Sequence, residues 1–147
     1  MARSPQQQGR HSRQKGARLE RSFRRRLEDN TDSTFRRTQA LGEKQRGRIG
    51  DVECVDGDWP FFAECRNREG WSLDQVIQGK GPVWKWWGEC QTKLDGLEPI
   101  LVFTRNRVPT YILVSTEGFT WWCEQFGTPS VYMRFSGTDS RLFILEI

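Results

Sequence analysis

The most restrictive feature of the sequence is an uninterrupted apolar run, PILVF, at residues 99–103. A short run without polar alternation is typical of a strand that is buried on both faces of its sheet. A sheet with two buried faces needs a covering layer on each side, and helices commonly provide it. The run therefore predicts a central strand inside an α/β fold.

An amphipathic helix is predicted over residues 13–28. Leu19, Phe23 and Leu27 recur every four residues, close to the helical period, and arginines occupy the other sides. Ser12 is the predicted N-cap, and the polar sequence DNTD is the predicted end. This helix has one face suited to packing against the sheet.

The other predicted elements follow from apolar patterning and turn residues. A helix is expected at residues 83–94, and a short helix or an aromatic loop at residues 119–126. Further strands are expected at residues 111–114, 131–135 and 142–147, the last of them at a sheet edge. Residues 33–48 are expected to form a basic loop, and residues 70–82 a linker.

Two strands, residues 49–55 and 61–66, flank the turn sequence DGDWP, which predicts a β-hairpin. Counting outward from the turn places Asp51 opposite Cys65. Asp51 and Glu64 then become neighbours across the ladder, within reach of a common ion. The alternative is that Asp51 caps a turn and Glu64 forms an ion pair on a solvated strand.

The order of helix, hairpin, helix and strands predicts an α/β fold with a mixed central β-sheet flanked by helices. The chain of 147 residues suits one domain. We expect a flexible basic arm at residues 1–12 and a single domain at residues 13–147.

Positive charge is concentrated near the N-terminus, since residues 1–48 carry a net charge of +9 and the rest of the chain −5. A basic segment joined to an acidic body predicts a polyanionic partner. The candidate phosphate contacts are Arg10, Arg13, Lys15, Arg18, Arg21, Arg24, Arg25, Arg36, Arg37, Lys44, Arg46 and Arg48. The alternative is that about half of the arginines only solvate the first helix.

Several classes of protein are excluded by composition. The four cysteines include no Cys-x-x-Cys pair and His11 is the single histidine, so a zinc site lacks its usual ligands. A thiol nucleophile would have no histidine base in the predicted domain. No apolar run approaches the roughly 20 residues of a membrane span, and we expect no secretory signal because the N-terminal residues are polar and rich in arginine. We expect a cytoplasmic protein with reduced thiols.

Three motifs in a fixed order resemble a known family. The first helix contains KGARLER from Lys15, a strand opens on GDV at Gly50, and the next strand carries Glu64-x-Arg66. With the Trp-rich helix that follows, these motifs resemble the PD-(D/E)xK nuclease core, and more narrowly the archaeal-type Holliday junction resolvases and their phage relatives. The resemblance covers residues 13–114 and implies a restriction-endonuclease-like core.

The resemblance also implies a metal centre for Mg²⁺ or Mn²⁺. Asp51 and Glu64 would be the principal ligands, Glu20 would reach the ion from the helix, and the main-chain carbonyl of Cys65 would complete the set. Carboxylate oxygens are the ligands that Mg²⁺ prefers. The implied accessory candidates are Glu89 and Gln91. Lys85 is a further candidate, as a lysine that approaches the site from the following segment.

Arg66 stands where the family has lysine. An arginine can hold a phosphate through its planar fork and stabilise the charge on phosphorus. It cannot act as a general base, because the guanidinium stays protonated.

The function implied is metal-dependent resolution of four-way DNA junctions by phosphodiester hydrolysis, in the cytoplasm of a prokaryotic or phage-infected cell. A C2 homodimer is expected, because a four-way junction has approximate twofold symmetry. The alternatives are a nicking or repair nuclease with the same core, and a branched-DNA-binding module without catalysis.

Tryptophan is abundant, with seven in the chain. Trp84, Trp86 and Trp87 cannot all face one side of a helix, so we expect some of them at the surface or in a dimer interface. Further interface candidates are Trp121, Trp122, Tyr132 and Phe135. Core packing is the alternative for each tryptophan.

Overall fold

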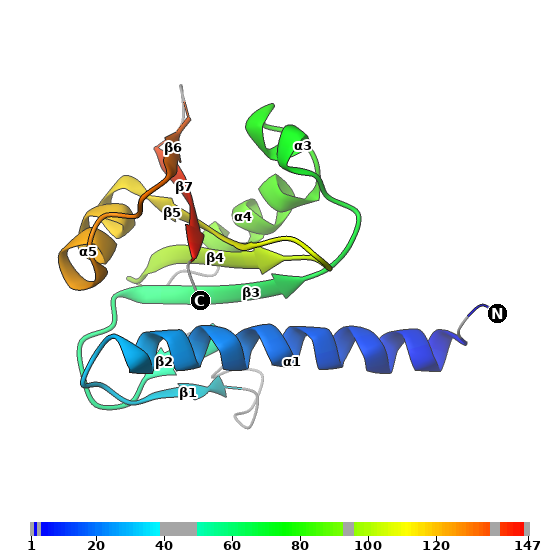
Figure 1. The fold of residues 1–147 in the computed structure, drawn as a ribbon, viewed down its shortest axis with the longest axis horizontal. Helices are drawn as coiled ribbons and strands as arrows, with labels where there is room; N and C mark the ends of the chain where they lie inside the picture. Colours follow the sequence, from blue (N-terminus) through cyan, green and yellow to red (C-terminus); the bar gives the residue numbers. More distant parts are fainter. Residues whose placement is uncertain (1, 3, 39–49, 93–95, 136–138, 146–147) are drawn as a thin grey trace.

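The structure is a computed structural model that describes residues 2, 4–38, 50–92, 96–135 and 139–145 (Figure 1). The elements in chain order are α1 (Pro5–Asp29), β1 (Phe35–Arg37), β2 (Val52–Cys54), β3 (Phe61–Asn67), α3 (Leu73–Ile77), α4 (Pro82–Thr92), β4 (Glu98–Thr104), β5 (Thr110–Ser115), α5 (Thr116–Phe126), β6 (Tyr132–Arg134) and β7 (Ser140–Leu145).

A five-stranded sheet with the order β3-β4-β5-β7-β6 forms the centre of the fold, and β1 and β2 form a separate two-stranded sheet. β3 pairs with β4 in parallel, whereas the other neighbours in the large sheet are antiparallel. The predicted mixed sheet flanked by helices is therefore confirmed.

β4 is the predicted central strand, and it is buried from Pro99 to Thr104. Its alternate side chains enter two separate cores. Ile100 and Val102 pack with residues of α1 and α5, whereas Leu101 and Phe103 pack with residues of α4. Both faces of the sheet are thus covered, as the apolar run requires.

α1 begins earlier than predicted. Ser4 is the N-cap, since its hydroxyl accepts from the Gln7 N–H at 3.2 Å and the Gln7 side chain accepts from the Ser4 N–H at 3.0 Å. The predicted N-cap at Ser12 is wrong, because this capping box and Pro5 at the first helical position start the helix at Pro5. The predicted apolar stripe of Leu19, Phe23 and Leu27 is confirmed as buried.

Residues 5–12 are helical and exposed, and Figure 1 shows the N-terminal end of α1 extending beyond the sheet. Their predicted flexibility, and the division into an arm at residues 1–12 and a domain at residues 13–147, stay predictions.

The predicted hairpin is wrong. β2 pairs with β1 instead, with Arg37 opposite Val52, and an isolated parallel bridge joins Gly50 to Ala63 of β3. The turn sequence does not reverse the chain into a ladder, because Trp59 is half-buried and packs edge-on against Phe35 and Phe61, each at 5.1 Å between ring centroids.

Three smaller expectations also change. The predicted linker at residues 70–82 contains α3, which begins with a second capping box, between Ser72 and Gln75. The predicted basic loop contains β1, and residues 39–49 lie outside the described residues. β7 is not an edge strand, because β6 pairs with its outer side.

The predicted helix at residues 83–94 is confirmed as α4 as far as Thr92, and residues 93 and 94 lie outside the described residues. Residues 119–126 are helical in α5, and the four cysteines are unbridged. None of the described helices is long and apolar enough to cross a membrane.

The tryptophans are buried or half-buried, and none of the seven is fully exposed. Trp86 and Trp87 are buried, and the Trp84 indole N–H donates to the Val76 carbonyl at 2.9 Å. Trp122 is also buried. Trp84 is half-buried, so its place at the surface or in a dimer interface stays a prediction. Among the interface candidates, Tyr132 is the exposed one, at 50%, and the homodimer stays a prediction.

Candidate active site

Gly50 brings the chain unusually close to β3. Its φ angle is +81°, and a Cβ atom there would lie 2.3 Å from the Ala63 carbonyl oxygen. Only glycine combines this backbone conformation with so close an approach. The Asp51 N–H donates to the same carbonyl at 2.6 Å, so Asp51 is anchored beside β3.

A second backbone contact anchors Asp51 from the other side. The Thr38 N–H, at the end of β1, donates to the Asp51 carbonyl at 3.0 Å, and the Thr38 hydroxyl donates to the Gly50 carbonyl. Thr38 is buried. The two strands therefore hold Asp51 between them.

The Asp51 carboxyl group points toward β3, where Oδ2 accepts from the Cys65 N–H at 2.8 Å. The pKa of Asp51 is raised from 3.8 to about 6, mainly by burial and also by the negative charges of Glu64 and Glu20. The hydrogen bond from Cys65 and the charge of Arg66 act in the opposite direction. The three acids predicted from the sequence therefore share one electrostatic neighbourhood.

A cleft of about 330 Å³ opens between α1 and the end of β3. It is lined by Ser12, Arg13, Gly16, Ala17, Glu20, Asp51, Cys65, Arg66, Asn67 and Arg68. Two acids and three arginines thus share a surface, which is the composition expected where a cation and a phosphate are bound together.

Two of the three acids are turned toward arginines. Glu20 Oε2 lies 2.8 Å from Arg37 Nε, and Glu64 Oε2 lies 2.7 Å from Arg66 Nη2. The described residues contain no group of three acidic, histidine or cysteine side chains gathered at ligand spacing. Glu64 also does not line the cleft directly.

The donor set nevertheless fits a hard divalent cation. Carboxylate oxygens are its preferred ligands, and Asp51 is a carboxyl whose ionised form is destabilised by burial and by two neighbouring acids. A cation at this position would relieve that destabilisation. Arg66 Nη1 lies 3.5 Å from the Cys65 carbonyl oxygen, a distance longer than that of an ordinary hydrogen bond.

Lys85, Glu89 and Gln91 lie on α4, which packs on the opposite face of the sheet from α1, and they do not line the cleft. Their accessory role stays a prediction.

The predicted basic residues fall into two groups. Arg10, Arg13, Arg18 and Arg21 line an open groove along α1 together with Gln14 and Ala17. Arg13 and Ala17 also line the acidic cleft. The basic groove and the cleft are therefore continuous.

The other basic candidates are placed differently. Lys15 is buried, with Nζ 3.4 Å from Glu69 Oε1. Arg24 pairs with Glu28, Arg36 with Glu53 and Arg37 with Glu20, whereas Arg25 is exposed. Lys44, Arg46 and Arg48 lie outside the described residues. Phosphate contacts by these residues stay predictions.

Sequence reasoning missed Asn67 and Arg68 as cleft residues and Arg37 as the partner of Glu20. Asn67 and Arg68 directly follow the Glu64-x-Arg66 motif, and this position in the chain could have identified them as cleft residues. Arg37 gave no such signal, because its pairing depends on β1 and β2.

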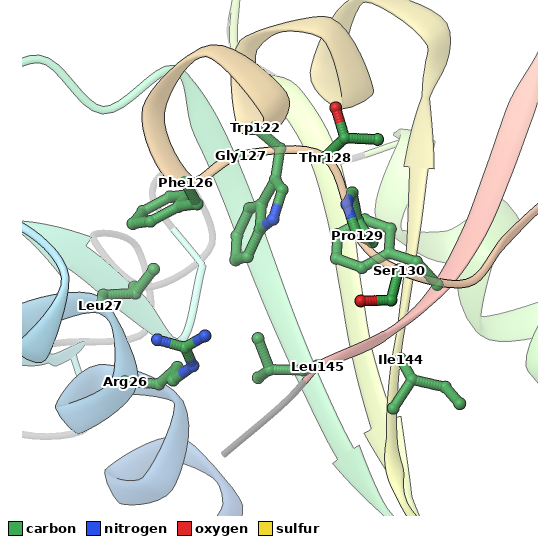
Figure 2. Close-up of a pocket in the computed structure, with 11 residues that line it drawn as sticks. Arg26, Leu27, Trp122, Phe126, Gly127, Thr128, Pro129, Ser130, Ile144 and Leu145 are labelled. Carbon is green, nitrogen blue, oxygen red and sulfur yellow. The ribbon is translucent and has the colours of Figure 1, made fainter.

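A second cavity, of about 100 Å³, lies between α1, α5 and β7. Figure 2 shows Trp122, Phe126 and Leu145 around it, with Arg26 at one side. It contains none of the predicted acids, so it is not the candidate active site.

A mixed sheet that places Asp51 beside Glu64-x-Arg66, with a helix acid facing the same cleft, defines a nuclease of the PD-(D/E)xK type. A family model described as "Phage putative PDDEXK endonuclease" matches residues 11–136. The chain belongs to this family of phage endonucleases, whose superfamily generally uses divalent metal ions. Searches of curated proteins and of solved structures gave no match.

Proposed function

We propose that the protein is a Mg²⁺- or Mn²⁺-dependent endonuclease that resolves four-way DNA junctions as a C2 homodimer. The observation that supports metal-dependent hydrolysis most directly is the Asp51 carboxyl, with its pKa raised to about 6 by burial and by Glu64 and Glu20 beside a basic cleft. Perturbed carboxyl groups in clefts are typical of catalytic sites.

In this proposal Asp51 and Glu64 hold the cation, assisted by the Cys65 carbonyl and by Glu20. A bound divalent ion supplies an activated water and stabilises charge that develops on phosphorus. Arg66 holds a non-bridging phosphate oxygen through its fork. It remains protonated and removes no proton from the water.

Recognition of branched DNA is supported by the basic groove that continues from the cleft along α1. Arginines on one helix face are suited to phosphate contacts, which carry no base sequence information. Shape would therefore dominate recognition. Two copies related by a twofold axis would place two clefts on opposite strands of a junction.

The decisive experiment compares a synthetic four-way junction with a linear duplex of the same sequence, with and without Mg²⁺. We expect symmetric paired nicks in the junction that require the ion. Equal nicking of both substrates would instead indicate a nicking or repair nuclease. Junction binding without any metal-dependent product would indicate a non-catalytic module.

Replacing Arg66 by Lys is expected to raise the cleavage rate by about tenfold, because lysine can lose a proton and arginine cannot. The dissociation constant for the junction should change by less than about twofold. Single-turnover cleavage and fluorescence anisotropy measure the two quantities. Arg68→Lys is the control, since it changes another arginine of the same cleft; equal effects on rate and affinity would contradict the role given to Arg66.

The basic groove is tested by salt dependence. The double variant Arg18→Gln, Arg21→Gln should lower the slope of log affinity against log salt by about 0.9 for each phosphate that the protein no longer neutralises. Arg25→Gln is a control, because Arg25 is exposed on the same helix but does not line the groove. If Arg25→Gln lowers the slope as much as one groove arginine does, the groove has no special role.

A further inference from the structure

Arg37 occupies an unexpected position in the structure. Strand alternation turns Phe35 and Arg37 toward α1, whereas Arg36 faces the other side and pairs with Glu53. Arg37 Nε lies 2.8 Å from Glu20 Oε2, and these two side chains are only 20% and 15% exposed. One of the two acids that line the cleft therefore has an oxygen engaged by a guanidinium.

The same strand end also positions Asp51. Arg37 is paired with Val52, and the next residue, Thr38, donates to the Asp51 carbonyl at 3.0 Å. The end of β1 thus contacts one acid of the cleft through the backbone and the other through the Arg37 side chain. A change in the partner of Arg37 would therefore directly affect Glu20 and Asp51, the two acids that line the cleft.

A guanidinium and a divalent cation compete for the same carboxylate, since each neutralises it. A DNA phosphate would give Arg37 an alternative partner, because arginine forms strong paired hydrogen bonds with phosphate oxygens. Cleft and basic groove are continuous, so a DNA strand bound in the groove would pass close to this pair.

We propose that Arg37 is a positioning residue that couples DNA binding to metal binding. In the free protein it holds Glu20 away from the ion, and a DNA phosphate takes the guanidinium and releases the carboxylate. This inference rests on the proposed nuclease function. The coupling is reciprocal, so DNA raises the affinity for the ion and the ion raises the affinity for DNA by the same factor.

Calorimetric titration of the full chain with Ca²⁺ tests the proposal, because Ca²⁺ takes the same oxygen ligands. Titrations are made without DNA and with a short four-way junction, whose integrity is checked on a gel. Arg37→Met should bind Ca²⁺ about fivefold tighter or more than the wild-type protein in the absence of DNA, since one competing charge is removed. The increase in Ca²⁺ affinity that the junction causes should be smaller in this variant by the same factor.

Arg37→Lys keeps the charge and should restore most of the wild-type behaviour. Arg36→Met is the matched control, because it removes an arginine–glutamate pair on the same strand at the opposite face. It should leave the Ca²⁺ affinity in the absence of DNA unchanged, and thermal melts of each variant verify folding.

Unchanged or weaker Ca²⁺ binding by Arg37→Met, or an equal effect of Arg36→Met, would overturn the coupling role. If the wild-type protein cleaves DNA in Mg²⁺ while Arg37→Met keeps wild-type coupling, the inference fails alone. If the wild-type protein neither binds a divalent ion nor cleaves DNA, the proposed function fails as well.

Discussion

Asp51→Asn is expected to abolish DNA cleavage and, at neutral pH, to stabilise the protein. Asparagine matches aspartate in size and can still accept the hydrogen bond from the Cys65 N–H. It offers no negative charge to a divalent ion, so the cleavage rate should fall by about 10² to 10⁴-fold. Junction binding should persist, because the basic groove is untouched. Single-turnover cleavage and anisotropy measure both effects.

The gain in stability follows from the pKa of Asp51, which folding raises from 3.8 to about 6, first through burial. A carboxyl with a raised pKa in the folded state binds its proton more tightly there than in the unfolded chain. The contribution of this bound proton to the free energy of unfolding is complete below pH 3.8 and is lost as the pH rises through 6. Above that pH the ionised group costs about 1 to 3 kcal/mol, and asparagine removes this cost.

Urea unfolding of Asp51→Asn and wild type at pH 7.5 and pH 4 measures the difference, which should be large at pH 7.5 and small at pH 4. Asp56→Asn is a control of opposite sign, because the hydrogen bond from the Thr34 N–H lowers the pKa of that exposed carboxylate. Asp56→Asn should not increase the free energy of unfolding at pH 7.5. A loss of junction binding by Asp51→Asn with unchanged residual cleavage would contradict the assignment.

Local patterns predicted the elements whose formation depends on local residues. The run at residues 99–103 indicated a strand buried on both faces, and the spacing of Leu19, Phe23 and Leu27 indicated the buried side of α1. Both patterns record which side chains must leave water, and this requirement does not depend on distant partners.

Helix starts were predictable in principle, although the sequence-based boundaries differ from those of the structure. Ser4 and Gln7 have the spacing of a capping box and Pro5 stands at the first helical position, and Ser72 and Gln75 repeat the box before α3. These short polar motifs lie in segments without apolar periodicity, so periodicity alone places the helix starts too late or omits them.

Strand pairing could not be read from the sequence, because it depends on contacts between distant segments. The DGDWP sequence has turn residues, but Trp59 gains more by packing against Phe35 and Phe61 than it would in a solvated hairpin turn. The proximity of Asp51 to Cys65 was predicted from the wrong ladder. It arises instead through the parallel bridge between Gly50 and Ala63.

That bridge makes Gly50→Ala the substitution with the largest expected effect on the fold. The added methyl group would lie 2.3 Å from the Ala63 carbonyl oxygen and 2.7 Å from its nitrogen, both backbone atoms of a strand that cannot move aside easily. Alanine is also strained at a φ of +81°. Together these effects should lower the free energy of unfolding by about 3 kcal/mol or more.

Gly70→Ala separates the two causes, because Gly70 has a φ of +92° but open space around its missing Cβ. It should cost only about 1 to 2 kcal/mol, the part due to backbone strain. Urea unfolding compares the variants, and cleavage by the folded fraction shows whether Asp51 has moved. Equal losses of stability in both variants would mean that the approach of Gly50 to β3 is not what holds Asp51 in the cleft. A stable Gly50→Ala protein that cleaves DNA normally would remove the geometric basis of the candidate active site.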